Sequence, residues 1–252
     1  RDGQQFDIGF ARGDKVRELS VTGTVAKRTT GTRVHFWPEA SYFDSPRFSS
    51  NKLLHLLRAK AVLCPGLRID FDDRVEKQQH SWCYQDGLRD YLKSALREWL
   101  LLPPETFTGS FSAATETADW SVAWLPEGGT AVTESYVNLI PTPQGGTHVN
   151  GLRQGLLEAM REFCEFRSLL PRGVKLAPED IWERCAYVLS VKMQDPQFAG
   201  QTKERLSSRQ SAAFVAGVVK DAFSLWLNQH TDVALQLGEL CINSAQARMR
   251  KA

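Results

Sequence analysis

Residues 193–206, MQDPQFAGQTKERL, form a polar stretch between two regular patterns. The residues before it, 187–191, read YVLSV, a run typical of a strand, and apolar side chains at helical spacing follow it. Pro196 cannot donate to a sheet ladder, so the strand should end before it. Gly200 lets the backbone turn freely. The stretch therefore predicts a loop that joins a strand to a long helix.

The chemistry of this loop centres on Gln201 and Lys203. These residues are two positions apart, so an extended loop would point both side chains the same way. A neutral amide and an ammonium directed together suit one terminal phosphate. The alternative is that Lys203 is simply a solvated charge, and the loop by itself leaves both interpretations open.

The composition is that of an ordinary globular protein. The 252 residues are enough for one large domain or two modest ones, with 42% apolar and 24% charged residues. With 31 Lys and Arg against 29 Asp and Glu, any nucleic-acid contact must come from a local patch. The five cysteines form no C-x-x-C pair, so neither a zinc site nor a disulfide framework is indicated. No apolar run approaches the length of a membrane span and no signal peptide is present, which predicts a cytoplasmic protein without a membrane partner.

The rest of the sequence contains patterns typical of strands and patterns typical of helices. Strands are predicted at residues 5–10, 19–21, 32–36, 67–71, 107–111, 119–125, 135–140 and 187–193. Helices are predicted from 53, from 88 to 99, from 149 to 166, from 179 to 184, after 207 and from about 231. This order favours two α+β layers over an alternating parallel fold. A new pattern starts after residues 85–87, which predicts a domain boundary there.

A few single positions carry structural expectations. Ser207 or Ser208 should cap the helix after the loop. His148 has no nucleophile near it in the sequence, so it is interpreted as structural or as a hydrogen bonder at a helix start. The basic residues from Arg248 to Lys251 are interpreted as a solvated helix end.

Several stretches, taken together and in order, carry a family resemblance. They are TGTRVHFWP (30–38), AKAVLCPG (59–66), PTPQGGTHVNGLR (141–153), YVLSVK (187–192) and the loop at 193–206. They resemble the ATPase subunits of type II DNA topoisomerases, the gyrase B family, over nearly the whole chain. The resemblance is closer to the topoisomerase IV branch of these B subunits than to gyrase B, notably at FDSPRF (43–48) and ESYVNLIP (134–141).

The resemblance implies an α+β fold in two domains. Residues 1–86 would be the C-terminal half of a GHKL-type ATPase sandwich. Residues 87–252 would be a ribosomal S5 domain 2-like transducer domain with a long C-terminal helix. It also implies an enzyme, an ATP-dependent type II topoisomerase that couples ATP binding and hydrolysis to clamp closure and duplex passage, for decatenation and relaxation. The alternatives are gyrase B, or a non-enzymatic scaffold for dimerisation around a DNA cavity.

The resemblance also implies roles for particular residues. Lys203 would act catalytically by neutralising the γ-phosphate of ATP, and Gln201 would hydrogen-bond to it. Gly31 and Thr32 would lie at the adenine, and Arg1 at the mouth of the nucleotide pocket. Taken without the family, Thr32 is a β-branched strand residue.

A DNA contact is implied at one further position. Arg153 would face the central hole between two copies of the chain, where a phosphate contact would be positional rather than sequence-reading. The alternative for Arg153 is a solvated helix arginine.

The implied cofactors are ATP and Mg²⁺, with the main ligands expected before Arg1. The implied partners are the A subunit of topoisomerase IV, a second copy of the chain and double-stranded DNA. The chain has no initiator Met, and we expect it to be a piece of a longer protein. The family's general-base Glu, Mg²⁺-binding Asn, adenine-binding Asp, glycine-rich lid and TOPRIM domain have no counterpart in it. We therefore expect no ATP hydrolysis by residues 1–252 alone.

Overall fold

The computed structural model describes residues 1–251 and divides the chain into two compact units, Arg1–Ser49 and Ser50–Ala252. The elements of the first unit are β1 (Gln4–Ala11), β2 (Asp14–Thr24) and a short 3-10 helix, η1 (Ala40–Tyr42). β1 and β2 form an antiparallel hairpin. Arg12 and Gly13 at its turn have φ angles of 55° and 88°, the left-handed backbone that tight hairpin turns require.

The strand predicted at residues 32–36 does not form. Residues 31–39 have no regular structure, and Val34 and Phe36 are 78% and 61% exposed. An alternating pattern tells which side chains would share a face, but a strand also needs a neighbour to accept and donate its backbone hydrogen bonds. None of the strands among residues 1–251 pairs with this segment.

The second unit combines a hairpin, a five-stranded sheet and helices. Its helices are α1 (Ser50–Leu63), α2 (Leu88–Ala95), α3 (Thr147–Phe166), α4 (Pro178–Trp182), α5 (Arg209–Gln229) and α6 (Thr231–Lys251). The hairpin strands are β3 (Ile69–Asp73) and β4 (Gln78–Trp82). The sheet strands, in spatial order, are β5 (Leu102–Ser112), β6 (Glu116–Trp124), β9 (Cys185–Met193), β7 (Thr133–Val137) and β8 (Ile140–Pro141). Only β7 and β9 pair in parallel; the other neighbours are antiparallel.

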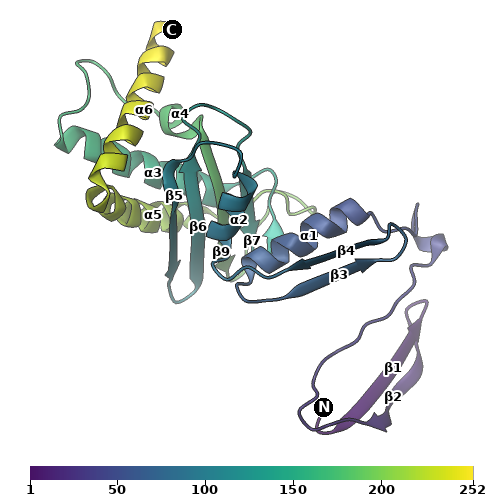
Figure 1. The fold of residues 1–252 in the computed structure, drawn as a ribbon. Coiled ribbons are helices and arrows are strands. Elements are labelled where there is room, and N and C mark those ends of the chain that lie inside the picture. Colours follow the sequence, from purple (N-terminus) through teal and green to yellow (C-terminus); the bar gives the residue numbers. More distant parts are fainter. Residues whose placement is uncertain (252) are drawn as a thin grey trace. The chain divides into compact units, whose positions relative to one another are not determined.

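Helices cover both faces of the five-stranded sheet (Figure 1). The alternation of β9 demonstrates this, because odd-numbered residues from Cys185 to Met193 join the core under α3, α5 and α6. Ala186 and Val188 face the other way, into a smaller core with α1 and α2. A strand with apolar residues on both faces is buried on both sides, which explains the nearly continuous apolar run in its sequence.

Two glycines let α3 and α5 approach closely. A Cβ added at Gly151 would lie 2.5 Å from the carbonyl oxygen of Ala212, and one at Gly155 would lie 2.6 Å from that of Ala216. The glycines are four residues apart, so they occupy one face of α3. This contact fixes α3, and with it the chain that enters α3, against the sheet.

Several predicted boundaries are wrong. The strand expected at 19–21 begins at Asp14, and the strand expected at 135–140 ends at Val137, before a separate β8. Two further differences lie around residues 95–107. α2 ends at Ala95 instead of continuing to 99, and β5 begins at Leu102 rather than at 107. The strand tolerates Pro103 because β5 is at the edge of the sheet and its register is broken between Leu102 and Phe107.

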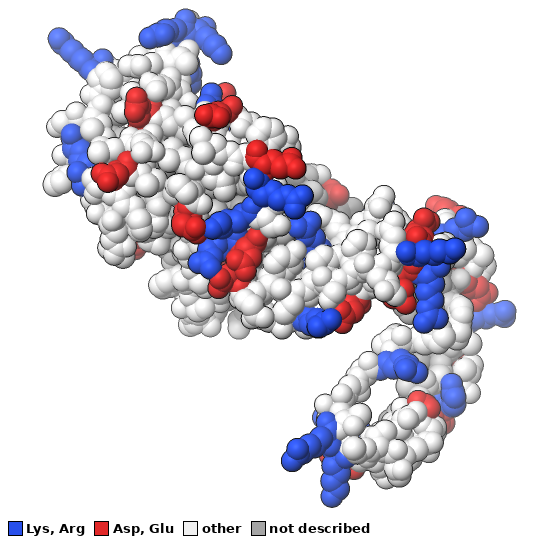
Figure 2. All heavy atoms as spheres, viewed as in Figure 1, with Lys and Arg blue, Asp and Glu red and all other residues white. Residues whose placement is uncertain are grey.

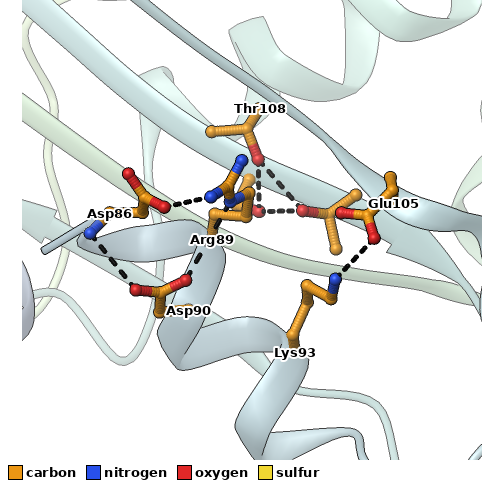
Figure 3. Close-up of polar contacts among 8 residues, drawn as sticks. Asp86, Arg89, Asp90, Lys93, Glu105 and Thr108 are labelled. Atoms are coloured by element: carbon orange, nitrogen blue, oxygen red, sulfur yellow. Dashed lines mark hydrogen bonds and ion pairs between the residues drawn. The ribbon is translucent and has the colours of Figure 1, made fainter. Parts of the chain in front are cut away.

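Ion pairs of α2 and its flanking residues lie beside hydrogen-bonded hydroxyl groups of the sheet (Figure 3). Arg89 pairs with Asp86 and lies 4.0 Å from Asp90, and Lys93 reaches Glu105 of β5 at 2.7 Å. Because these charges are exposed, each pair contributes little to stability. The apolar side of α2, which is buried against the sheet, is what holds the helix.

None of the helices among residues 1–251 is long and apolar enough to span a bilayer.

Candidate functional site

The loop after β9 is closed at its base by backbone hydrogen bonds. Ala199 donates to the carbonyl of Arg205 at 2.9 Å, and Ser207 donates to that of Gln197 at 2.8 Å. Phe198 and Leu206 form an antiparallel bridge between these bonds. The closed base leaves residues 200–204 as a short protruding tip.

Gln201 and Lys203 both lie exposed at this tip. The expected extended conformation is wrong at Lys203, whose φ is 57° and whose amide donates to the carbonyl of Gly200 at 3.3 Å. The tip is therefore a tight turn, because the closed base leaves too few residues for an extended path. Among residues 1–251 the Lys203 ammonium makes no hydrogen bond or ion pair, so it remains available to an anion.

The base of the loop is joined to the residues that lead into α3. Leu206 donates to the carbonyl of Gly145 at 3.0 Å, and the amide of Thr147 donates to the carbonyl of Leu206 at 3.1 Å. A Cβ at Gly146 would lie 2.3 Å from the carbonyl oxygen of Leu206, so only glycine permits this approach. The loop and the start of α3 are thus in direct backbone contact.

The serine cap expected for α5 takes another form. Ser208 is the N-cap residue by position, but its side chain makes no capping bond. Its Oγ instead accepts a 2.8 Å hydrogen bond from the amide of Gln197. The hydroxyl therefore helps to close the loop rather than to terminate the helix.

His148, the second residue of α3, is fully buried. Its Nε2 is 3.1 Å from Oγ1 of Thr142, which in turn is 2.7 Å from Oγ of Ser135. Burial lowers the pKa of His148 to about 4, so the imidazole is neutral at physiological pH. The geometry gives His148 a structural role in the described part of the chain.

Arg153 lies half-buried on α3, less than two turns after Thr147. It is near Tyr187, whose pKa is raised to about 12 by burial and, more weakly, by Cys185, while the charge of Arg153 acts in the opposite direction. Figure 2 shows cationic and anionic side chains interspersed on the visible face, in keeping with the near-neutral composition. A DNA contact at Arg153 would therefore be local.

The other sequence-predicted residues belong to the first unit. Arg1, Gly31 and Thr32 are all exposed there. The carbonyl of Arg1 accepts a 2.9 Å hydrogen bond from the amide of Gln4 at the start of the β1–β2 hairpin. The structure thus brings Gln201 and Lys203 together at one tip and places the nucleotide-pocket candidates in the unit Arg1–Ser49.

Two features of the site escaped the sequence interpretation. The side chain of Gln144 donates to Oε2 of Glu204 at 2.8 Å, across sixty positions of sequence. The Gly145-Gly146 pair in the sequence was the available signal, because consecutive glycines often mark a close backbone approach.

The basic C-terminal residues are not simply solvated, since Arg248 pairs with Asp180 at 2.9 Å.

A cleft of about 410 Å³ opens beside α2. Its lining includes Ser110, Asp119, Ser190 and Lys192 from the sheet and Leu63 and Leu88 from the helices. None of the predicted site residues lines it. Its charged groups have both signs, so it lacks the cationic character of a phosphate site.

The chain that carries this loop and its link to α3 has clear relatives among known proteins. The model of the DNA gyrase B family matches residues 87–252, more than half of the chain, and the chain belongs to that family. Its relatives include the B subunit of DNA topoisomerase 4 from Salmonella typhimurium, 68% identical over 252 residues, and that from Escherichia coli, 66% identical over 252 residues. The chain spans about 40% of the length of these curated relatives and is itself covered completely.

Two solved structures support the fold. The topoisomerase IV ATP binding domain of Francisella tularensis, in complex with a small molecule inhibitor, is 40% identical with a TM-score of 0.84, over 99% of this chain and 68% of that one. The 43K ATPase domain of Thermus thermophilus gyrase B, in complex with an aminocoumarin, is 27% identical with a TM-score of 0.84, over 100% of this chain and 68% of that one. The family resemblance and the α+β fold expected from the sequence are therefore confirmed.

Proposed function

We propose that this chain is part of the B subunit of a bacterial topoisomerase IV, the ATP-hydrolysing component of a cytoplasmic type II topoisomerase. The branch is favoured by identity, because relatives named as B subunits of DNA topoisomerase 4 reach 68%, against 27% for the Thermus gyrase B structure. In this proposal residues 1–86 belong to the ATPase domain and residues 87–252 form the transducer domain.

The observation that carries the proposal is the exposed, unpaired Lys203 at the tip of a loop with a closed base. A cation and a neutral amide at one tip, Lys203 and Gln201, fit the terminal phosphate of ATP. ATP would supply the free energy of its phosphoanhydride when bound. The chain's own residues would bind and orient it, with Gln201 donating to the phosphate and Lys203 offsetting its charge.

The rest of the nucleotide site would come from other residues. Gly31 and Thr32 would lie at the adenine and Arg1 at the mouth of the pocket. No group of three or more His, Cys, Asp or Glu side chains suited to a metal occurs among residues 1–251. Mg²⁺ would be held by the phosphates and by ligands that precede Arg1.

The partners follow from the same assignment. They would be the A subunit of topoisomerase IV, a second copy of the chain in an ATP-dependent dimer, and duplex DNA contacted by Arg153. Lys203 would meet nucleotide in the closed state and release it in the open state. That difference in contacts is what would allow ATP to shift the equilibrium between the two states.

The proposal is tested by Lys203→Ala in the full-length protein that carries this chain, assembled with its partner protein. We expect kcat/KM for ATP to fall about a hundredfold, because one preorganised charge contact to the phosphate is lost. ATP-dependent relaxation and decatenation should fall with it. Steady-state ATPase and gel assays of supercoiled and catenated DNA measure these effects.

Lys77→Ala is a matched control. Lys77 is also an exposed lysine in a turn with positive φ, 53° against 57° for Lys203, so alanine meets similar backbone strain at both positions. We expect wild-type activity from this variant. Unchanged ATPase and DNA relaxation in Lys203→Ala would refute the proposal.

A further inference from the structure

The strongest unassigned feature is the polar contact between the Lys203 loop and the residues before α3. The amide of Gln144 donates to the carbonyl of Glu204 at 3.0 Å. The Gln144 side chain donates from Nε2 to Oε2 of the same glutamate at 2.8 Å. One residue thus holds Glu204 through both its backbone and its side chain.

The side-chain bond also determines where the Glu204 carboxylate lies. Glu204 follows Lys203 directly in the chain, so its carboxylate is the nearest acidic group in the sequence that could form an ion pair with the ammonium. Here the carboxylate is held by the Gln144 amide, and Lys203 has no ion pair among residues 1–251. Gln144 therefore keeps a competing anion away from the lysine.

We propose that Gln144 and Glu204 are positioning residues for Lys203. They fix the loop to the start of α3 and keep the lysine ammonium unpaired for an incoming phosphate. This inference rests on the proposed function, because it gives Lys203 the phosphate as its partner. Neither residue touches the nucleotide; both act through the lysine.

The same contact connects the loop to the helix that carries Arg153. Thr147, the first residue of α3, donates to the carbonyl of Leu206, and Gly146 lies against the Leu206 backbone. A displacement of the loop on phosphate binding is therefore transmitted to the start of α3. Because linkage is reciprocal, DNA at α3 should in turn change the affinity for nucleotide.

The test uses Gln144→Leu and Glu204→Leu in the full-length protein with its partner protein. Each removes the tether, and we expect kcat/KM for ATP to fall about fivefold to tenfold, mostly through a higher KM. The stimulation of ATPase by duplex DNA should decrease as well, which a merely structural loss would not produce selectively. The double variant should be no worse than either single variant, because both act on one interaction.

Two further variants and one further readout sharpen the test. Glu204→Gln should stay within about twofold of wild type, because its amide oxygen can accept the same hydrogen bond. Gln79→Leu removes an exposed amide that donates to Asp72 at 3.4 Å on the β3–β4 hairpin, and should leave activity unchanged. Hydrogen exchange at the Ala199 and Leu206 amides should be faster in Gln144→Leu, because the loop base opens more often.

These variants distinguish a failure of the positioning role from a failure of the proposed function. If Lys203→Ala loses activity while Gln144→Leu and Glu204→Leu keep wild-type kinetics and DNA stimulation, the positioning role is overturned and the proposed function stands. Faster exchange with unchanged kinetics also overturns it, since the loop would then not need the tether. If Lys203→Ala is silent as well, the proposed function itself is refuted.

Discussion

The buried surroundings of His148 lower its pKa and so keep its side chain neutral. An exposed histidine gains a proton near neutral pH, but the buried ring of His148 meets only a hydroxyl at Nε2 and has no hydrogen-bond partner at Nδ1 among residues 1–251. Without a carboxylate to stabilise the charged form, desolvation dominates. The first turn of α3 therefore carries a buried, neutral imidazole.

This makes stability dependent on pH. The folded pKa of about 4 lies below the ordinary histidine value of 6.5, so the unfolded state binds the proton first as the pH falls. The free energy of unfolding should decrease between pH 6.5 and about 4, by on the order of 3 kcal/mol from this group, and be unaffected by it above pH 6.5. Urea denaturation from about pH 5 to 7 measures the slope.

Two variants isolate the contribution of His148 to that slope. His148→Gln should flatten the dependence between about pH 5 and 6.5. His80→Gln, at an exposed position on β4, should preserve it. A slope that is equally steep in His148→Gln would contradict the assignment.

At the scale of elements, one ion pair fixes the last helix. Arg248 of α6 donates to both carboxylate oxygens of Asp180 at 3.0 and 2.9 Å. The Asp180 side chain is only 2% exposed and also accepts from the amide of Ala177 at 2.6 Å, at the start of α4. A single carboxylate thus joins α4 and α6.

Removing the arginine should be costly. Arg248→Ala would leave the buried carboxylate of Asp180 without its counter-charge, and we expect a clear decrease in the free energy of unfolding. Because the Arg248 side chain is 41% exposed, water reaches the pair, and the decrease should be smaller than for a fully buried ion pair. Urea denaturation of residues 1–252 measures it.

Two comparisons complete this prediction. Arg250→Ala, at an exposed position of the same helix, should change stability by less than about 0.5 kcal/mol. In the double variant Asp180→Asn and Arg248→Leu, the loss should be smaller than the sum of the single losses, because no charge is left buried. A loss in Arg248→Ala no larger than in Arg250→Ala would count against a buried pair.

At the scale of the whole molecule, the cores define which residues fold together. Both apolar cores of the second unit are built from residues between Ala59 and Ala245. The smaller core combines Ala59, Val62 and Leu63 of α1 with α2 and the sheet. The expected domain division at residues 86 and 87 remains a prediction, and it crosses this shared core.

Truncated fragments test how much the smaller core contributes to the free energy of unfolding. A fragment of residues 50–252 should unfold cooperatively by itself, because no core residue is lost. A fragment of residues 87–252 should be less stable by on the order of 3 kcal/mol, because it loses the apolar contacts of α1. Chemical denaturation of the two fragments compares them, and equal stability would show that α1 contributes nothing to the stability of residues 87–252.

The positions of most elements followed from the sequence, with particular exceptions. β9 and α3 were predictable because their apolar spacing is long and regular. The strand at residues 32–36 was not, because its pattern says nothing about whether a neighbour is present. The start of β5 was not, because Pro103 is acceptable only at the edge that β5 happens to occupy.

The sequence by itself determined the strand–loop–helix order around residues 193–206, the presence of an amide and an ammonium at Gln201 and Lys203, and the family. These depend on residue type and local spacing, which the chain carries wherever it folds. Only the tertiary structure decided the left-handed turn at Lys203, the bond between Gln144 and Glu204, and the pairing of Arg248 with Asp180. The two pairings join groups sixty or more positions apart, and the turn depends on a base closed between strand and helix. Such contacts are set by the path of the whole chain, which local periodicity does not encode.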